Sequence, residues 1–115
     1  MQYLLLIYEN ESDASVLVDA TMMSEYRAFT RRIVETGEFK AGDALAPTTT
    51  ATSVRVRDGE VLITDGPFAE THEQLAGYYL VEAANLDRAI EIARQIPSAR
   101  HGTVEVRPVR VWTPG

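Results

Sequence analysis

The sequence predicts a small α+β domain in which two helices cover one face of an antiparallel sheet. Three observations support this prediction. Residues 3–8 and 77–81 are almost continuously apolar, as buried strands are. Two other segments have apolar residues at helical spacing, and the order strand, helix, strand occurs twice. With 115 residues, of which 45% are hydrophobic, the chain is long enough for one domain over residues 1–115 and too short for two.

The first predicted strand covers residues 3–8, and polar residues from Glu9 onward end it. A strand that faces water on one side alternates between apolar and polar side chains, whereas this one does not. The same is true of residues 77–81. We therefore expect both strands to be buried on both faces.

The first predicted helix begins near Thr21. Its apolar stripe has steps of four, three and four residues and consists of Met22, Tyr26, Phe29 and Ile33. Met23 and Val34 are expected to widen this stripe. Asp19 or Thr21 can cap the start of the helix, and Gly37 can end it in a left-handed conformation.

A short strand and a loop are expected over residues 38–52, followed by a β-hairpin. Residues 53–57 alternate, Asp58-Gly59 favours a type I′ turn, and residues 60–64 return. A two-residue loop sets Val56 opposite Val61 and places the charged pair, Arg57 and Glu60, on the other face. The polar residues 69–76 can hold one helical turn.

The second predicted helix has Asn85 as its N-cap and ends at Pro97. Its expected inner stripe is Leu86, Ala89, Ile90, Ala93 and Ile96. The last strand, residues 103–111, places Val104 and Val106 on one face and Arg107 on the other. Pro108 interrupts that strand, which predicts an edge position or a bulge.

This order of elements predicts a ferredoxin-like antiparallel sheet with an inserted β-hairpin. Two helices cover only one face of such a sheet, although its strands look apolar on both faces. A second copy of the chain, packed sheet to sheet, would cover the other face, so we expect a homodimer. The alternative is that four tyrosines tolerate water through their hydroxyl groups: Tyr3, Tyr8, Tyr78 and Tyr79.

Composition excludes several classes of protein. The absence of cysteine rules out disulfides and thiolate metal sites, and it is consistent with a cytoplasmic protein. The net charge of −6 argues against nucleic-acid binding, which needs a basic face. No apolar run is long enough for a membrane span, and the N-terminal residues do not have the pattern of a signal peptide.

The segment Thr64-Asp65-Gly66-Pro67-Phe68-Ala69-Glu70 follows an apolar strand and leads into Gly77-Tyr78-Tyr79. These residues, together with the apolar start and the end at residues 104–108, resemble the YCII-related family in its DGPF subgroup. The resemblance covers nearly the whole chain and implies a dimeric α+β barrel. It also implies an enzyme built on a histidine–aspartate pair, but the first helix has no histidine and Gln95-Ile96-Pro97 has no acid. That pair cannot be transferred to this chain.

Asp65 is the candidate catalytic acid or base, because a partly buried carboxylate beside Phe68 would suit proton transfer. The alternative is structural: its carboxylate accepts backbone N–H groups of the turn. Gly66 suits unusual dihedral angles and Pro67 stiffens the turn. Phe68 is expected to anchor in the core or the dimer interface.

Arg107 is expected either to pair with Asp65 or Glu70 or to bind an anionic ligand. The spacing of Glu70, His72 and Glu73 matches no standard metal motif, so no metal or other cofactor is predicted. We expect His101 to be an exposed turn residue.

Two functions remain open at this point. In the first, a small molecule binds in a pocket beside the sheet at the dimer interface, lined by Asp65, Glu70, Arg107, Tyr26 and Tyr78. In the second, the chain is a non-catalytic regulatory or interaction module. Some proteins that resemble this chain are encoded near extracytoplasmic-function sigma factors. The second hypothesis is therefore that the chain acts as an accessory to such a factor.

Overall fold

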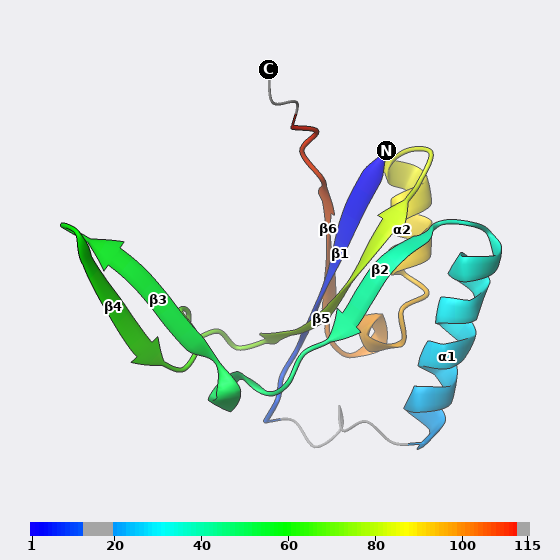
Figure 1. Cartoon of the computed structure of the whole chain (residues 1–115). Coiled ribbons are helices and arrows are strands. Elements are labelled where there is room, and N and C mark those ends of the chain that lie inside the picture. The colour runs from blue at the N-terminus through cyan, green and yellow to red at the C-terminus, as the bar shows by residue number, and fades with distance from the viewer. Residues whose placement is uncertain (13–19, 113–115) are drawn as a thin grey trace.

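The structure is a computed structural model, and it describes residues 1–12 and 20–112 (Figure 1). The elements along the chain are β1 (Gln2–Glu9), α1 (Ala20–Glu35), β2 (Phe39–Ala44), η2 (Thr48–Thr50), β3 (Thr52–Arg57), β4 (Glu60–Asp65), β5 (Gln74–Glu82), α2 (Leu86–Ala93), η3 (Pro97–Arg100) and β6 (Thr103–Pro108), where η marks a 3₁₀ helix. Four strands form an antiparallel sheet in the order β2-β5-β1-β6, and β3 pairs with β4 in a second sheet. The predicted α+β class, with two helices and an antiparallel sheet, is confirmed.

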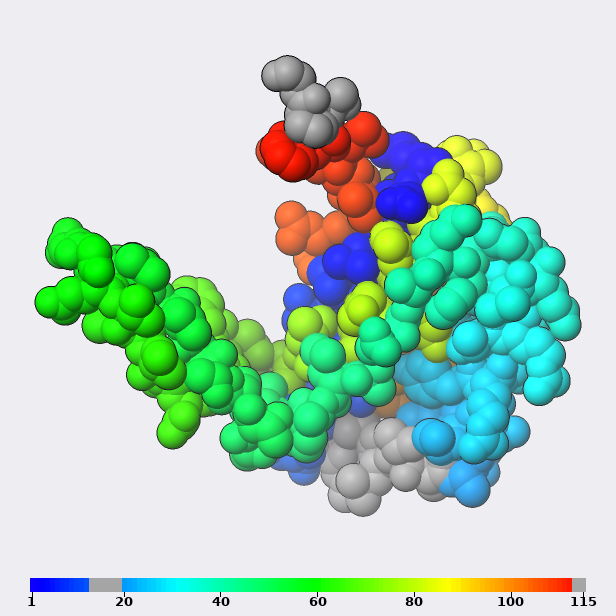
Figure 2. Space-filling view, viewed as in Figure 1, coloured from blue at the N-terminus to red at the C-terminus, as the bar shows by residue number. Residues whose placement is uncertain are grey.

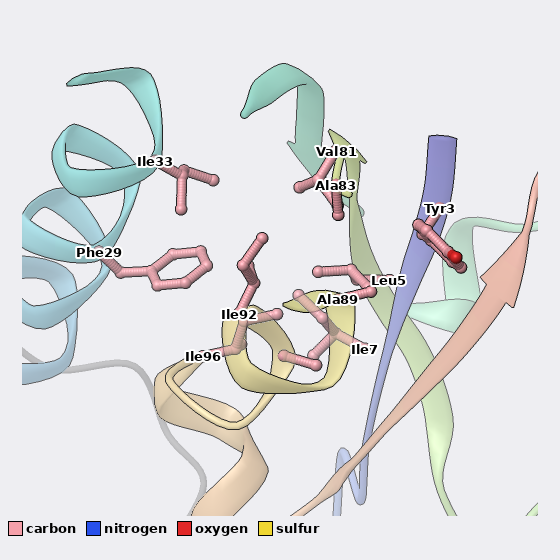
Figure 3. Close-up of a cluster of buried hydrophobic side chains, with 11 residues drawn as sticks. Tyr3, Leu5, Ile7, Phe29, Ile33, Val81, Ala83, Ala89, Ile92 and Ile96 are labelled. Carbon is pink, nitrogen blue, oxygen red and sulfur yellow. The ribbon is translucent and has the colours of Figure 1, made fainter. Parts of the chain in front are cut away.

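The core lies between the four-stranded sheet and the two helices, which cover the same face (Figures 1 and 3). Alternate residues of β1 point into this core: Tyr3, Leu5 and Ile7. Phe29 of α1 and Val81 of β5 meet them and are fully buried. Burial of such side chains contributes roughly 1.5–3 kcal/mol each to folding.

Helix α1 has the predicted buried stripe, although the stripe is narrower than expected. Met22, Phe29 and Ile33 are buried, whereas Met23 and Val34 are exposed. The prediction that the last two widen the stripe is therefore wrong, because only one line of contacts faces the sheet. Asp19 lies outside the described residues, and Thr21 lies within the helix.

Gly37 ends α1 as predicted, with φ of +81°. Its N–H donates to the Val34 carbonyl oxygen over 3.1 Å, and the Glu38 N–H donates to the Ile33 carbonyl oxygen over 2.9 Å. These two bonds are a Schellman motif, which satisfies carbonyl groups that a helix end leaves unpaired. The chain then turns directly into β2.

Helix α2 begins at the predicted N-cap, where Asn85 Oδ1 accepts the Arg88 N–H over 2.9 Å. The predicted inner stripe is wrong in part: Leu86 and Ile90 are exposed, and Ile92 is buried instead. The helix ends at Ala93, before the proline, and Pro97 opens η3.

Residues 69–76 hold no helical turn, contrary to the prediction. Strand β5 begins at Gln74, because its first residues pair with the end of β1. Ala76 is the extra residue of a bulge, since Gly77 pairs with Ile7 and Leu75 pairs with Tyr8.

The hairpin β3–β4 has the predicted register, with Val54 opposite Ile63 and Val56 opposite Val61. Its turn residue Asp58 has a positive φ, as a type I′ turn requires. The hairpin projects from the rest of the chain, and Figure 2 shows a hollow between the two. The radius of gyration, 16.2 Å, exceeds the roughly 13 Å of a compact domain of about this length.

The second face of the four-stranded sheet faces away from both helices (Figure 1). On β1 and β5 it carries five apolar or aromatic side chains that are half-buried: Leu4, Leu6, Tyr8, Tyr78 and Leu80. We call this surface the open face. Strand β6 is an edge strand, as Pro108 predicted, and its Arg107 lies opposite Leu4. Neither helix of the described chain has the length and hydropathy of a membrane-crossing segment.

Candidate functional site

A pocket of about 330 Å³ lies between α1 and the side of the sheet formed by β2 and β5. It is lined by Ile7, Glu9, Met23, Tyr26, Thr30, Phe39, Gly42, Asp43, Ala44, Ala76, Gly77, Tyr78 and Tyr79. Most of this lining is apolar or aromatic, and Glu9 and Asp43 are its carboxylates. The volume is at the lower end of the range for small-molecule sites, roughly 300–1,000 Å³.

The polar end of the pocket is organised by Ser98, which is fully buried. Its hydroxyl donates to the carboxylate of Glu9, and it lies 2.5 Å from the hydroxyl of Tyr26. These three residues come from β1, α1 and η3. Pro97 opens η3 with its fixed φ, and this places the next residue, Ser98, under the end of β1.

His101 lies behind Glu9, with its Nε2 atom 3.9 Å from Glu9 Oε1. Its side chain is only 22% exposed, and Nε2 is buried without a hydrogen-bond partner. His101 lies in a turn, as predicted, but the prediction that it is exposed is wrong. The cause is the neighbouring Gly102, which packs against the carbonyl of Tyr8 so closely that a Cβ atom would lie 2.2 Å from that oxygen.

Tyr79 forms a second polar point in the pocket. Its hydroxyl lies 2.8 Å from the hydroxyl of Thr30, and its ring packs edge-on against Phe29 and Phe39. Burial raises the pKa of Tyr79, and burial together with the Glu9 carboxylate raises the pKa of Tyr26. Both hydroxyl groups therefore keep their protons at neutral pH and can act as donors.

Tyr78 and Tyr26 both line the pocket, so the structure brings together these two predicted ligand-binding residues. Strand alternation nevertheless directs the Tyr78 side chain to the open face, opposite Tyr79. There its hydroxyl donates to Asp43 Oδ2 over 2.8 Å, which raises the pKa of Tyr78.

Asp65 is the last residue of β4 and is exposed, at the base of the hairpin. Within the described chain its carboxylate makes neither a hydrogen bond nor an ion pair, so the expected Asx-turn bonds are not present. Gly66 has φ of +102°, as its predicted role requires, and its N–H donates to the Ala51 carbonyl oxygen. Phe68 is 78% exposed instead of lying in the core, and the Arg55 guanidinium lies 5.7 Å from its ring.

Glu70 and Arg107 are exposed and do not line the pocket. In residues 1–12 and 20–112, no ion pair joins Arg107 to Asp65 or to Glu70. The same residues contain no group of three or more histidine, aspartate or glutamate side chains placed to hold a metal ion. Within one chain, three of the five predicted pocket residues therefore lie apart from the pocket.

Sequence reasoning missed Glu9 and Thr30 as pocket residues and Ser98 as the buried residue that connects Glu9 to Tyr26. They are far apart in the chain, so no spacing connects them. One signal was available: a serine follows Ile96-Pro97 in an apolar context, where a buried hydroxyl needs a partner. That signal does not identify the partner.

The chain is similar to known proteins over nearly its whole length. The family model of the YCII-related domain matches residues 1–113. An uncharacterized protein of Rhizobium meliloti (strain 1021) is 41% identical over 120 residues, an alignment that covers 100% of this chain and 97% of the relative. The chain belongs to the YCII-related domain family.

Proposed function

We propose that this chain binds a small molecule in the pocket between α1 and the β2–β5 side of the sheet. The observation that carries the proposal is the combination of an apolar pocket with a polar end at Glu9 and Tyr26, which the buried Ser98 connects. Small-molecule sites have this composition, with a few convergent polar groups that orient the ligand in apolar surroundings. Within one chain Asp65 is not part of the pocket, so an acid–base role for it requires a second copy to bring the end of β4 there.

The experiment is a fragment screen by protein-observed NMR. Binding in the pocket predicts fragments that shift the signals of Tyr26 and Thr30. The Met23→Trp variant places a bulky ring in the pocket lining and should weaken these fragments about tenfold, the equivalent of roughly 1.4 kcal/mol. Val34→Trp is the matched control, because Val34 is also an exposed apolar residue of α1 but does not line the pocket. A screen in which no fragment shifts these signals contradicts the proposal.

We also propose that the chain forms a homodimer in which the second copy covers the open face. The hairpin projects away from the rest of the chain, and a hollow separates the two (Figure 2). The hairpin carries exposed apolar side chains: Val54, Val56, Val61 and Ile63 on one face and Leu62 on the other. Large exposed apolar surfaces such as the open face and this hairpin face are typical of protein interfaces. From the strand order we assign the four-stranded sheet to the ferredoxin-like type and its dimer to the α+β barrels. From residues 64–70 we assign the chain to the DGPF subgroup.

Sedimentation equilibrium at micromolar concentration tests the dimer, and a monomer mass contradicts it. Ile63→Lys should weaken the dimer without unfolding the protomer, because Ile63 is 67% exposed within one chain. Val34→Lys introduces the same charge on the outer side of α1 and should leave the dimer intact.

The alternative function, an interaction module without catalysis, is favoured by the same exposed hairpin. An accessory of an extracytoplasmic-function sigma factor would use this apolar surface to contact its partner. If the chain sediments as a monomer and no fragment binds in the screen, the alternative is favoured over the small-molecule proposal.

A further inference from the structure

We infer that the ligand of this pocket is an organic cation: an amine that is protonated at neutral pH and carries an apolar or aromatic body. The inference rests on the proposed function, and it names the chemical class of the ligand and the residue that selects it. That residue is Glu9.

Glu9 is a largely buried carboxylate, and within residues 1–12 and 20–112 no lysine or arginine forms an ion pair with it. Its side chain is 14% exposed, and its bonded partner is the neutral hydroxyl of Ser98. Among the described residues, the ionisable group paired with it is His101, whose Nε2 lies 3.9 Å from Glu9 Oε1, a distance too long for a hydrogen bond. A buried charge is costly unless it is paired, so Glu9 favours a cation in the pocket.

The other residues that line the pocket also favour a positively charged ligand. Among the residues that the structure describes, Glu9 and Asp43 are the charged members of the lining, and none of the others is a lysine, arginine or histidine. Because Asp43 pairs with Tyr78 on the open face, an anionic ligand would meet the Glu9 carboxylate and no compensating charge from these lining residues. The basic groove that contains Arg32, Arg94 and Arg100 is a separate depression on the far side of α1.

The aromatic rings of the pocket favour a cation as well. Tyr26, Phe39 and Tyr79 all line it. The face of an aromatic ring attracts an ammonium group, and the attraction is stronger where water is excluded. A carboxylate next to aromatic rings therefore recognises both the charge and the apolar body of an amine.

The test compares three probes of nearly the same shape: 2-phenylethylamine, 2-phenylethanol and phenylacetate. Their dissociation constants are measured by NMR titration of the full chain, using the signals of Tyr26 and Thr30. The amine is expected to bind about tenfold more tightly than the alcohol, because a charge-assisted hydrogen bond is stronger than a neutral one. Phenylacetate is expected to have the weakest affinity of the three. In Glu9→Gln, whose amide oxygen can still accept from Ser98, the advantage of the amine over the alcohol should disappear.

Glu35→Gln is the control. It removes the same charge from an exposed residue of α1 and should keep the tenfold preference. Equal binding of amine and alcohol to the unmodified chain overturns the inference, and so does tighter binding of phenylacetate at these signals. If Glu9→Gln does not fold, this ranking in the unmodified chain decides the question. If probes bind without preference for the amine, only the inference fails, whereas the absence of any shift at these signals counts against the proposed function too.

Discussion

Replacing Ser98 by alanine changes the side-chain volume very little but should disturb the hydrogen bonds of the site strongly. Ser98 is fully buried, donates to Glu9 and lies within hydrogen-bond distance of the Tyr26 hydroxyl. Ser98→Ala deletes one oxygen atom and leaves two polar groups short of a partner. One of them, Glu9, is charged.

The size of the effect follows from these contacts. A buried polar group that loses its partner costs about 1–3 kcal/mol, and more if it is charged. Glu9 and Tyr26 retain some access to the pocket, where water can replace part of the lost bonding. We therefore expect Ser98→Ala to lower the free energy of unfolding by about 2 kcal/mol, at the middle of that range. For a domain of this size the midpoint of thermal unfolding should fall by roughly 8 °C.

Circular dichroism during thermal and urea unfolding measures both quantities. Ser53→Ala is the control, since its hydroxyl donates to the Gly66 carbonyl oxygen in the exposed hairpin, and it should cost less than about 0.5 kcal/mol. Combining Ser98→Ala with Tyr26→Phe should cost less than the sum of the two single changes, because each removes the same bond. A loss below about 0.5 kcal/mol for Ser98→Ala, or strict additivity with Tyr26→Phe, would refute the network described here.

Three further outcomes are expected. Hydrogen bonds from Arg88 lower the pKa of Glu38 below its ordinary 4.5, so this pair stabilises the fold fully above pH 4.5 and loses its effect as the pH falls. Glu38→Gln should cost about 1 kcal/mol in urea unfolding at pH 7, with the difference disappearing in acid; a constant difference would exclude the pair as its cause. Gly102→Ala places a Cβ atom 2.2 Å from the Tyr8 carbonyl oxygen and should lower the urea midpoint by the equivalent of about 1–3 kcal/mol, whereas an unchanged midpoint would contradict that packing. Asp65→Asn should change stability by less than about 0.5 kcal/mol in thermal unfolding, and a larger loss would show that its carboxylate holds the turn.

Local patterns predicted most of the fold because each depends on residues close together in the chain. The hairpin register follows from Asp58-Gly59, and the end of α1 follows from Gly37. The buried side of α2 could not be predicted in the same way. Its apolar stripe is broad, and only contact with the sheet decides that Ile92 is buried while Leu86 is exposed.

The candidate site was predicted less well, because it is assembled from distant segments. Tyr26 was identified from its helical spacing, but its partner Ser98 is 72 positions away, and Glu9, which accepts from Ser98, is 17 positions from Tyr26. The motif around Asp65 has strong turn chemistry and ends a strand, which suggested a site. In the structure that strand belongs to the projecting hairpin, so the same residues lie apart from the pocket within one chain.

The projecting hairpin has a consequence for local opening of the chain. Its strands pair with each other, and the bond from the Gly66 N–H to the Ala51 carbonyl oxygen closes its base, so it can open while the core stays intact. Amide hydrogens of β3 and β4 should then exchange with solvent far faster than those of β1 and β5. If a second copy covers the hairpin, their exchange slows as the protein concentration rises. Hydrogen exchange at two concentrations would thus report assembly residue by residue.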